Sequence, residues 1–231
     1  MEGTGPDPMR ARDDARKASF IELALEYEVL RFGAFTLKSG RRSPYFFNAG
    51  HFHDARALAR VGAAYADTIV DAGLEFDVLF GPAYKGIPLA VATAVALARD
   101  HGRNCGVAYN RKEAKDHGEG GVLVGAPLAG RVLLVDDVIT AGTAVREVLP
   151  LVEAAGGRVT GIVTALDRQE RGAGTRSAVQ ELAEELGVPV RAIVTLEDLA
   201  EWLARAGRSE EFERVHAYRA AYGVTPLEGT A

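Results

Sequence analysis

Hydrophobic residues in this chain follow two alternating patterns, short apolar runs and longer segments with helical spacing. The short runs are rich in Val, Leu and Ile, which is typical of strands buried on both faces of a sheet. They predict strands at residues 77–80, 105–110, 132–135, 158–166 and 190–194. The segments between and after them predict helices at residues 55–72, 87–99, 144–155, 177–186, 196–206 and 210–222. Because strands alternate with helices, we predict an α/β fold with a mostly parallel central sheet flanked by helices.

The N-terminal part of the chain departs from this alternation. Residues 1–17 mix Gly, Pro, Arg and Asp without a hydrophobic period, so we expect a disordered extension there. An amphipathic helix is predicted from Ser19, and the aromatic residues and Ser-Gly-Arg turn of residues 32–48 predict a hairpin of two strands. No repeat or internal linker follows, so residues 18–231 are predicted to form a single domain.

The composition is that of a globular protein and excludes few functions. The 231 residues are 48% hydrophobic and 26% charged, and the net charge of −5 lacks the basic excess of general nucleic-acid binders. One cysteine, Cys105, allows no internal disulfide. No apolar run is long enough to span a bilayer and no signal peptide is apparent, so we expect a cytoplasmic protein without membrane or nucleic-acid partners.

The segment at residues 132–144 carries the strongest indication of chemistry. A predicted buried strand ends on Asp136 and Asp137, and a Thr-Ala-Gly-Thr turn then leads into a helix. The start of a helix presents unpaired N–H groups that bind phosphate, and the threonine hydroxyls and the glycine would add donors and close backbone approach. The carboxylates would repel phosphate and suit sugar hydroxyls or a metal ion instead. We therefore predict a ribose 5-phosphate site, with simple helix capping as the alternative.

A second polar segment follows the predicted strand that ends at residue 110. Residues 111–121 carry the donors Arg111, Lys112, Lys115 and His117 together with several glycines. Such a loop could hold a polyanion and close over a site, excluding water. From charge alone, the alternative is a solvated loop whose charges of both signs cancel.

The loop at residues 81–86 joins another predicted strand to a helix and contains Tyr84 and Lys85. A lysine on a loop is usually only solvated, but flanking glycines and a position after a buried strand favour a role in binding. In a parallel sheet, ligands bind beyond the carboxyl ends of the strands. We therefore expect this loop, the two polar segments above and the loop at residues 167–172 to converge on one site.

The motif at residues 132–144 resembles the phosphoribosyl pyrophosphate (PRPP) motif of the type I phosphoribosyltransferases. Together with the hairpin, the Lys-Asp-His-Gly segment and Arg168, it narrows the resemblance to the orotate phosphoribosyltransferases, from about residue 20 to about residue 224. The resemblance implies a type I phosphoribosyltransferase fold with a small N-terminal hood, contributed mainly by residues 18–50. It also implies transfer of ribose 5-phosphate from PRPP to orotate, giving orotidine 5′-monophosphate and pyrophosphate in pyrimidine biosynthesis.

The same resemblance assigns roles to individual residues. It implies PRPP contacts for Lys38, Tyr84, Lys85, Arg111, Lys112, Lys115, His117, Asp136, Asp137, Val138, Ile139, Thr140, Ala141, Gly142, Thr143 and Ala144. It implies orotate contacts for Lys38, Phe46, Phe47, Thr140 and Arg168. Catalytic roles are implied for Lys115 as the leading cation and for Arg111, His117, Lys85 and Asp137. A cis peptide bond between Ala83 and Tyr84 is implied as well.

Cofactor and partners follow from the resemblance in the same way. Mg²⁺ would be carried mainly by PRPP, with Asp136 and Asp137 as indirect contacts rather than assigned ligands. The enzyme would be a homodimer in which residues 111–121 reach into the neighbouring subunit's site. Arg111 and Lys115 would then act in trans, together with His117.

Several alternatives stay open at this point. The PRPP motif contacts only the shared sugar, so transfer to a purine or to uracil is one, and a regulator that keeps the fold without catalysis is another. Arg168 could meet the orotate carboxylate in a bidentate manner, or it could pair with Asp167 or Glu170. Of Phe46 and Phe47, one is expected to be an ordinary core residue.

Overall fold

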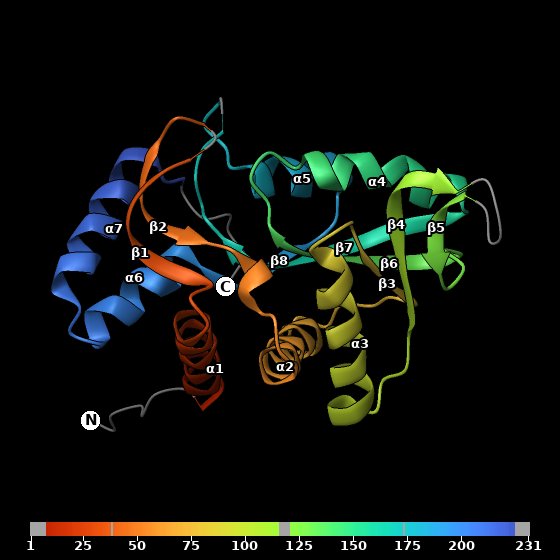
Figure 1. The fold of residues 1–231 in the computed structure, drawn as a ribbon, viewed down its shortest axis with the longest axis horizontal. Helices are drawn as coiled ribbons and strands as arrows, with labels where there is room; N and C mark the ends of the chain where they lie inside the picture. The colour runs from red at the N-terminus through yellow and green to blue at the C-terminus, as the bar shows by residue number, and fades with distance from the viewer. Residues whose placement is uncertain (1–7, 38, 116–120, 173, 225–231) are drawn as a thin grey trace, which may run out of the picture.

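The computed structural model describes residues 8–37, 39–115, 121–172 and 174–224, and places a central sheet beside a smaller hairpin (Figure 1). The sheet comprises β3 (Val78–Gly81), β4 (Gly106–Lys115), β5 (Gly121–Gly125), β6 (Gly130–Val138), β7 (Gly157–Asp167) and β8 (Val190–Thr195). Their order is β5-β4-β3-β6-β7-β8, with β5 antiparallel to β4 and the other neighbours parallel. The predicted α/β fold with a mostly parallel sheet is confirmed.

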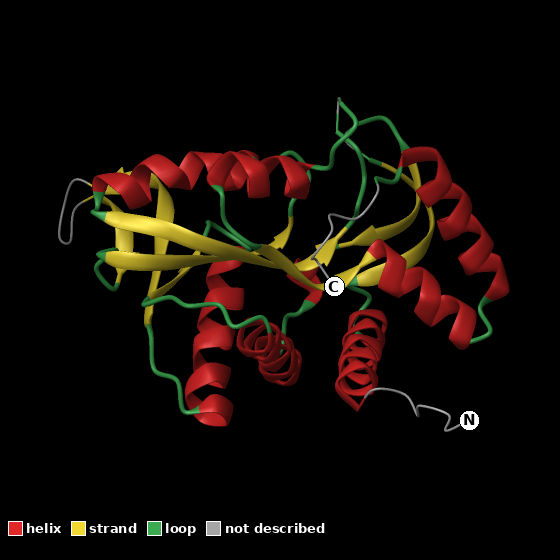
Figure 2. Ribbon diagram, turned by 180° about the vertical axis from the view of Figure 1, so that it is seen from behind, coloured by secondary structure: helices red, strands yellow, loops and turns green. Residues whose placement is uncertain are grey.

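Helices cover both faces of this sheet (Figures 1 and 2). One face carries α1 (Pro8–Glu26), α2 (Ala55–Asp71) and α3 (Gly86–His101), and the other carries α4 (Thr143–Ala154) and α5 (Ala178–Leu186). The strands are apolar on both faces for this reason: in β6, Leu133 and Val135 join the core cluster with α1 to α3, whereas Val132 and Leu134 join the cluster with α4 and α5. Among the described residues, no helix is both long and apolar enough to cross a membrane.

The hood stands beyond the β8 edge of the sheet. It contains the antiparallel strands β1 (Leu30–Thr36) and β2 (Arg42–Phe47), followed by the 3-10 turn η1 (Ala49–His51). The closing helices α6 (Leu196–Arg205) and α7 (Ser209–Tyr222) pack beside it (Figure 1). The Tyr45 ring of β2 meets the Tyr218 ring of α7 edge-on at 6.2 Å. The predicted hairpin is thus confirmed, and its partner in packing comes from the far end of the chain.

The first helix begins earlier than predicted. Residues 8–17 belong to α1, so the expectation of a disordered extension through residue 17 is wrong for this part; residues 1–7 lie outside the described residues. The charged residues that hid the helix form ion pairs with other helices: Lys17 with Asp198 of α6 at 3.0 Å, and Asp14 with Arg205 of α6 at 3.1 Å. Ion pairs hold this part of the helix, whereas the prediction relied on a periodic apolar face.

The prediction of a loop at residues 111–121 is also partly wrong. Residues 111–115 continue β4, and β5, which the hydrophobic pattern did not predict, pairs with it. The register of this ribbon is irregular between Asn110 and Lys115, and residues 116–120 lie outside the described residues. β5 has the sequence Gly-Val-Leu-Val-Gly, so its three apolar residues are too few to show the alternation by which strands are predicted.

Candidate active site

A cavity of about 740 Å³ lies between the hood and the carboxyl ends of β6 and β7. Its hood side is lined by Thr36, Leu37, Ser39, Arg41, Phe46 and Phe47. Its sheet side is lined by Lys85, Asp137, Val138, Ile139, Thr140, Asp167, Arg168, Gln169, Glu170, Arg171, Gly172, Ser177, Ala178 and Val179. The cavity therefore occupies the place where ligands bind in open α/β sheets, with the hairpin as its second wall.

The predicted phosphate-binding turn has the expected strand–turn–helix form. β6 ends at Val138, and α4 begins directly after Gly142, whose φ of 71° is left-handed. Thr140 and Thr143 are exposed, so their hydroxyls are accessible to a ligand. The turn is supported from behind by Arg146, whose Nη1 donates to the Ala141 carbonyl oxygen at 2.8 Å. The backbone is thus arranged as an anion site would require.

The two adjacent carboxylates occupy different environments. Both residues are only 9% exposed, but their contacts differ. The Asp136 carboxylate accepts from the Asp137 N–H at 2.9 Å, and the Asp136 carbonyl oxygen accepts from the buried Tyr65 hydroxyl at 2.6 Å. Burial, reinforced by the negative charge of Asp137, raises the pKa of Asp136 to about 7. Asp137 lines the cavity and accepts from Lys85 Nζ at 2.9 Å. Only the second carboxylate is therefore placed to meet a ligand directly.

The loop after β3 presents Tyr84 and Lys85. The Ala83–Tyr84 peptide bond is cis, which confirms the prediction. The Ala83 N–H donates to Asn110 Oδ1 at 3.0 Å, so β4 holds this loop in place. Tyr84 is 66% exposed, and Lys112 Nζ lies 5.3 Å from the centre of its ring.

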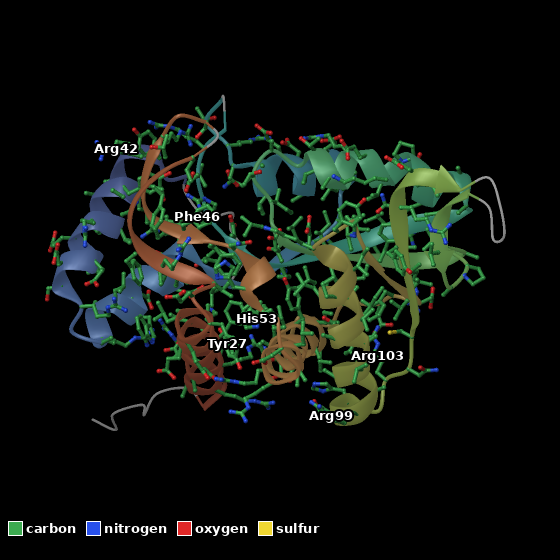
Figure 3. All side chains as sticks on the ribbon, in the orientation of Figure 1. Tyr27, Arg42, Phe46, His53, Arg99 and Arg103 are labelled. Carbon is green, nitrogen blue, oxygen red and sulfur yellow. The ribbon has the colours of Figure 1, made fainter. Side chains whose placement is uncertain are left out.

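Phe46 and Phe47 point to opposite sides of β2. Phe47 is 8% exposed and belongs to the main core cluster, which confirms that one of the pair is a core residue. Phe46 is half-buried and packs on Phe35, with ring centroids 5.5 Å apart. Figure 3 labels it on β2, nearer the middle of the molecule than Arg42 at the outer part of the hairpin. Lys38 lies outside the described residues.

Arg168 lines the cavity and is paired with Glu170, one of the two pairings considered from the sequence. Its Nε and Nη2 lie 2.8 and 2.6 Å from Glu170 Oε1, and Nη2 donates to Ser43 Oγ at 3.3 Å. Its guanidinium carbon lies 4.5 Å from the centre of the Tyr45 ring. The cation is 8% exposed, so these contacts fix its orientation before any ligand arrives.

The described residues of the basic segment do not line this cavity. Arg111 and Lys112 are on β4, and Arg111 Nη1 donates to the Gly121 carbonyl oxygen at 3.4 Å across to β5. Lys115 is the last residue of β4. Its side chain and the whole of His117 lie outside the described part of the structure. Among the described residues, neither Arg111 nor Lys112 lines the cavity of its own chain. Nor do the described residues contain a group of three side chains that could hold a metal ion.

Some contributors to the site escaped the sequence analysis. Ser43 and Tyr45 hold Arg168 together with Glu170, and Tyr65 holds the Asp136 carbonyl. For the strand residues a signal existed, because Ser43, Tyr45 and Phe47 alternate along β2 and share its buried side. Nothing in the sequence connects Tyr65 with residue 136, since their contact exists only once α2 is packed below β6.

The comparisons with known proteins agree with this geometry. Residues 48–195 match the family model described as a phosphoribosyl transferase domain. The orotate phosphoribosyltransferase of Pseudomonas aeruginosa is 60% identical over 211 residues, covering 91% of this chain and 99% of that protein. The orotate phosphoribosyltransferase of Vibrio cholerae is 58% identical over 211 residues, again with 91% and 99% covered.

Solved structures give the same answer. The crystal structure of orotate phosphoribosyltransferase from Francisella tularensis matches with a TM-score of 0.81 at 40% identity, covering 89% of this chain and 99% of that one. The enzyme from Mycobacterium tuberculosis in complex with PRPP matches with a TM-score of 0.60 at 26% identity, covering 80% and 98%. On its fold, its cavity and these relatives, the chain belongs to the orotate phosphoribosyltransferases.

Proposed function

We propose that the cavity beneath the hood is where this enzyme transfers ribose 5-phosphate from PRPP to orotate, forming orotidine 5′-monophosphate and pyrophosphate. One observation carries the proposal. The turn that follows β6 and the hood residues Phe46 and Phe47 line the same cavity, with Arg168 beside them. A sugar-phosphate site and a site for a planar anionic base are thereby adjacent, as the transfer requires.

The turn would hold the 5-phosphate. Its N–H groups at the start of α4, with the hydroxyls of Thr140 and Thr143, are donors in a position where a helix favours negative charge. Asp137 would accept hydrogen bonds from the ribose hydroxyls. Asp136 would support it from below through the Asp137 N–H.

Departure of pyrophosphate leaves positive charge on C1 of the ribose, so no protein nucleophile is needed. Catalysis would then rest on positioning and on cations that meet the departing charge. Lys85 would be one of these cations, and its support is that it lines the cavity and its ammonium group donates to Asp137. Tyr84 would contact the same pyrophosphate from the exposed loop.

Mg²⁺ fits the residues present if it is carried by PRPP. Asp137 offers a carboxylate at the cavity wall, and this ion is commonly held by few protein ligands and substrate phosphates. When bound, it would neutralise charge on the pyrophosphate. The protein's own part would be to orient the sugar hydroxyls through Asp136 and Asp137.

For the base, the hood and the loop after β7 would supply the contacts. Phe46 and Phe47 line one wall, and Thr140 and Arg168 line the facing part of the cavity. The N–H groups of Arg168 would meet polar atoms of orotate. Lys38, which lies between β1 and β2 in the sequence, completes the proposed set.

A homodimer would complete the site, with residues 111–121 crossing to the neighbouring subunit. The support is geometric. Arg111 is on β4, next to the edge strand β5, and does not line the cavity of its own chain. Helix α3, which packs on β4, exposes Val91 and Val95, at 45% and 58%. Arg111, Lys115 and His117 would then meet pyrophosphate in trans. A single domain over residues 18–231 and a cytoplasmic location belong to the same proposal.

Subunit mixing tests the shared site. A Lys115→Ala chain and an Asp137→Ala chain should each turn over orotate poorly, with Lys115→Ala lowering kcat far more than it raises KM. In a mixed dimer, one of the two sites would combine an intact loop with an intact Asp137. Recovery of up to about half of the wild-type activity per mixed dimer is expected after mixing.

Exchange of subunits must be verified with two differently tagged chains, and each chain mixed with itself is the control. Full exchange without recovery would contradict the shared site.

A further inference from the structure

We propose that Glu170 is a positioning residue for base binding: with Tyr45 and Ser43 it holds the Arg168 guanidinium in the one orientation that meets orotate. The inference rests on the proposed contact between Arg168 and orotate and goes beyond it. It assigns a role to three residues that do not themselves need to touch the substrate.

Glu170 holds the guanidinium along one edge. Its Oε1 lies 2.8 Å from Arg168 Nε and 2.6 Å from Nη2, so a single oxygen takes two donors. Both side chains are nearly withdrawn from water, at 9% exposure for Arg168 and 12% for Glu170. A buried charged pair of this kind is held far more rigidly than a surface pair, because water does not compete for its hydrogen bonds.

Strand β2 holds the guanidinium from a second direction. Arg168 Cζ lies 4.5 Å from the centre of the fully buried Tyr45 ring, and the Tyr45 hydroxyl donates to Glu170 Oε1 at 3.3 Å. Ser43 Oγ accepts from Nη2 at 3.3 Å. The plane of the guanidinium is therefore set by an aromatic face, and its rotation by acceptors on Glu170 and Ser43.

This arrangement decides what Arg168 can offer a ligand. Because Glu170 compensates its charge, Arg168 contributes directed N–H donors more than a net positive charge. A free arginine side chain would lose much rotamer entropy on binding a base, whereas this one is ordered beforehand. The benefit falls on the base, because the hydrogen bonds and ion pairs of Glu170 among the described residues go to Tyr45, Arg168 and Arg41. None of these three is proposed to bind the sugar phosphate or pyrophosphate.

Steady-state kinetics with both substrates tests the inference. Glu170→Ala should raise KM for orotate about tenfold and leave KM for PRPP within about twofold. Glu170→Gln should recover most of the loss, since an amide oxygen still accepts both N–H bonds. Glu211→Ala is the matched control: it removes the 2.7 Å partner of Arg208 on α7, away from the cavity, and should change neither KM.

A double-mutant cycle separates this inference from the proposal beneath it. If Glu170 acts through Arg168, then Arg168→Ala alone and Arg168→Ala with Glu170→Ala should have the same KM for orotate. An unchanged KM for orotate in Arg168→Ala would overturn the proposed orotate contact and this inference with it. A raised KM for orotate in Arg168→Ala but not in Glu170→Ala would overturn the inference alone. Equal rises in the KM values for orotate and PRPP in Glu170→Ala would do the same, and so would a Glu170→Gln variant with a KM for orotate no lower than that of Glu170→Ala.

Discussion

Asp136 and Asp137 show how far neighbouring residues of one type can differ. Consecutive side chains of a strand point to opposite faces, and of the two carboxylates only Asp137 lines the cavity. Asp136 holds its proton up to about pH 7, because its ionised form would be desolvated beside another negative charge. Near neutral pH, the pair therefore carries less negative charge than two fully ionised carboxylates would.

A pH-dependent stability follows for Asp136. Its pKa is raised in the folded state, so the folded form binds the proton more tightly and this stabilisation is lost as pH rises through about 7. Asp136→Asn stays neutral at every pH. Without substrate and with a chelator present, the variant should gain about 2 kcal/mol relative to wild type between pH 5 and pH 8.

Urea unfolding of both proteins at the two pH values measures this gain. The same difference in free energy of unfolding at pH 5 and pH 8 would show that Asp136 ionises normally in the folded protein.

Among the elements, the turn into α4 depends on a glycine at its last position. Gly142 has a φ of 71°, and a Cβ built there would lie 2.9 Å from Arg146 Nη1 and 3.0 Å from Leu182 Cδ1. Arg146 in turn donates to the Ala141 carbonyl, so crowding at Gly142 would disturb the backbone of the turn itself. The element's geometry and its proposed phosphate grip are therefore linked.

Gly142→Ala should accordingly raise KM for PRPP about tenfold and destabilise the protein by about 1 kcal/mol. Gly156→Ala is a matched control, because Gly156 also has a left-handed φ, 81°, but no atom lies within 4 Å of the added Cβ. It should show a similar loss of stability with an unchanged KM for PRPP. Equal KM values for PRPP in the two variants would argue against a phosphate site at this turn.

At the scale of the whole molecule, the sheet has two unlike ends. The β8 end carries the hood, α6 and α7, and one wall of the cavity (Figure 1). The other end carries the β4–β5 ribbon, with Arg111 and Lys112 on β4, and α3 with its exposed valines. Joining two copies at the second end would cover the valines and would bring the basic ribbon of each toward the other.

Val95→Glu should therefore dissociate the proposed homodimer, since a charge would be buried at the interface, and should reduce turnover of orotate at least about tenfold. Ala154→Glu, on α4 at the opposite face of the sheet, is the control and should leave both properties unchanged. Analytical ultracentrifugation with activity measured on the same samples tests this. A dimer of Val95→Glu with normal turnover would place the interface elsewhere.

Prediction from sequence succeeded where the chain is locally consistent. Helices and strands with a clear hydrophobic period were confirmed within a few residues, and so were the hairpin and the cis bond at Ala83–Tyr84. It failed at α1, whose charged residues form ion pairs, and at β5, which has only three apolar residues between two glycines. Periodicity measures burial of apolar faces, so elements that bury few of them give little signal.

By itself, the sequence determined the parallel sheet, the turn at residues 136–144 and the family, because these depend on local patterns and on a motif read in order. Only the tertiary structure decided how the Arg168 side chain is oriented. Its three partners, Ser43, Tyr45 and Glu170, include two from a hairpin far away in sequence, and they meet it only where the hood closes over β7. A guanidinium's direction depends on contacts in three dimensions, which no spacing along the chain records.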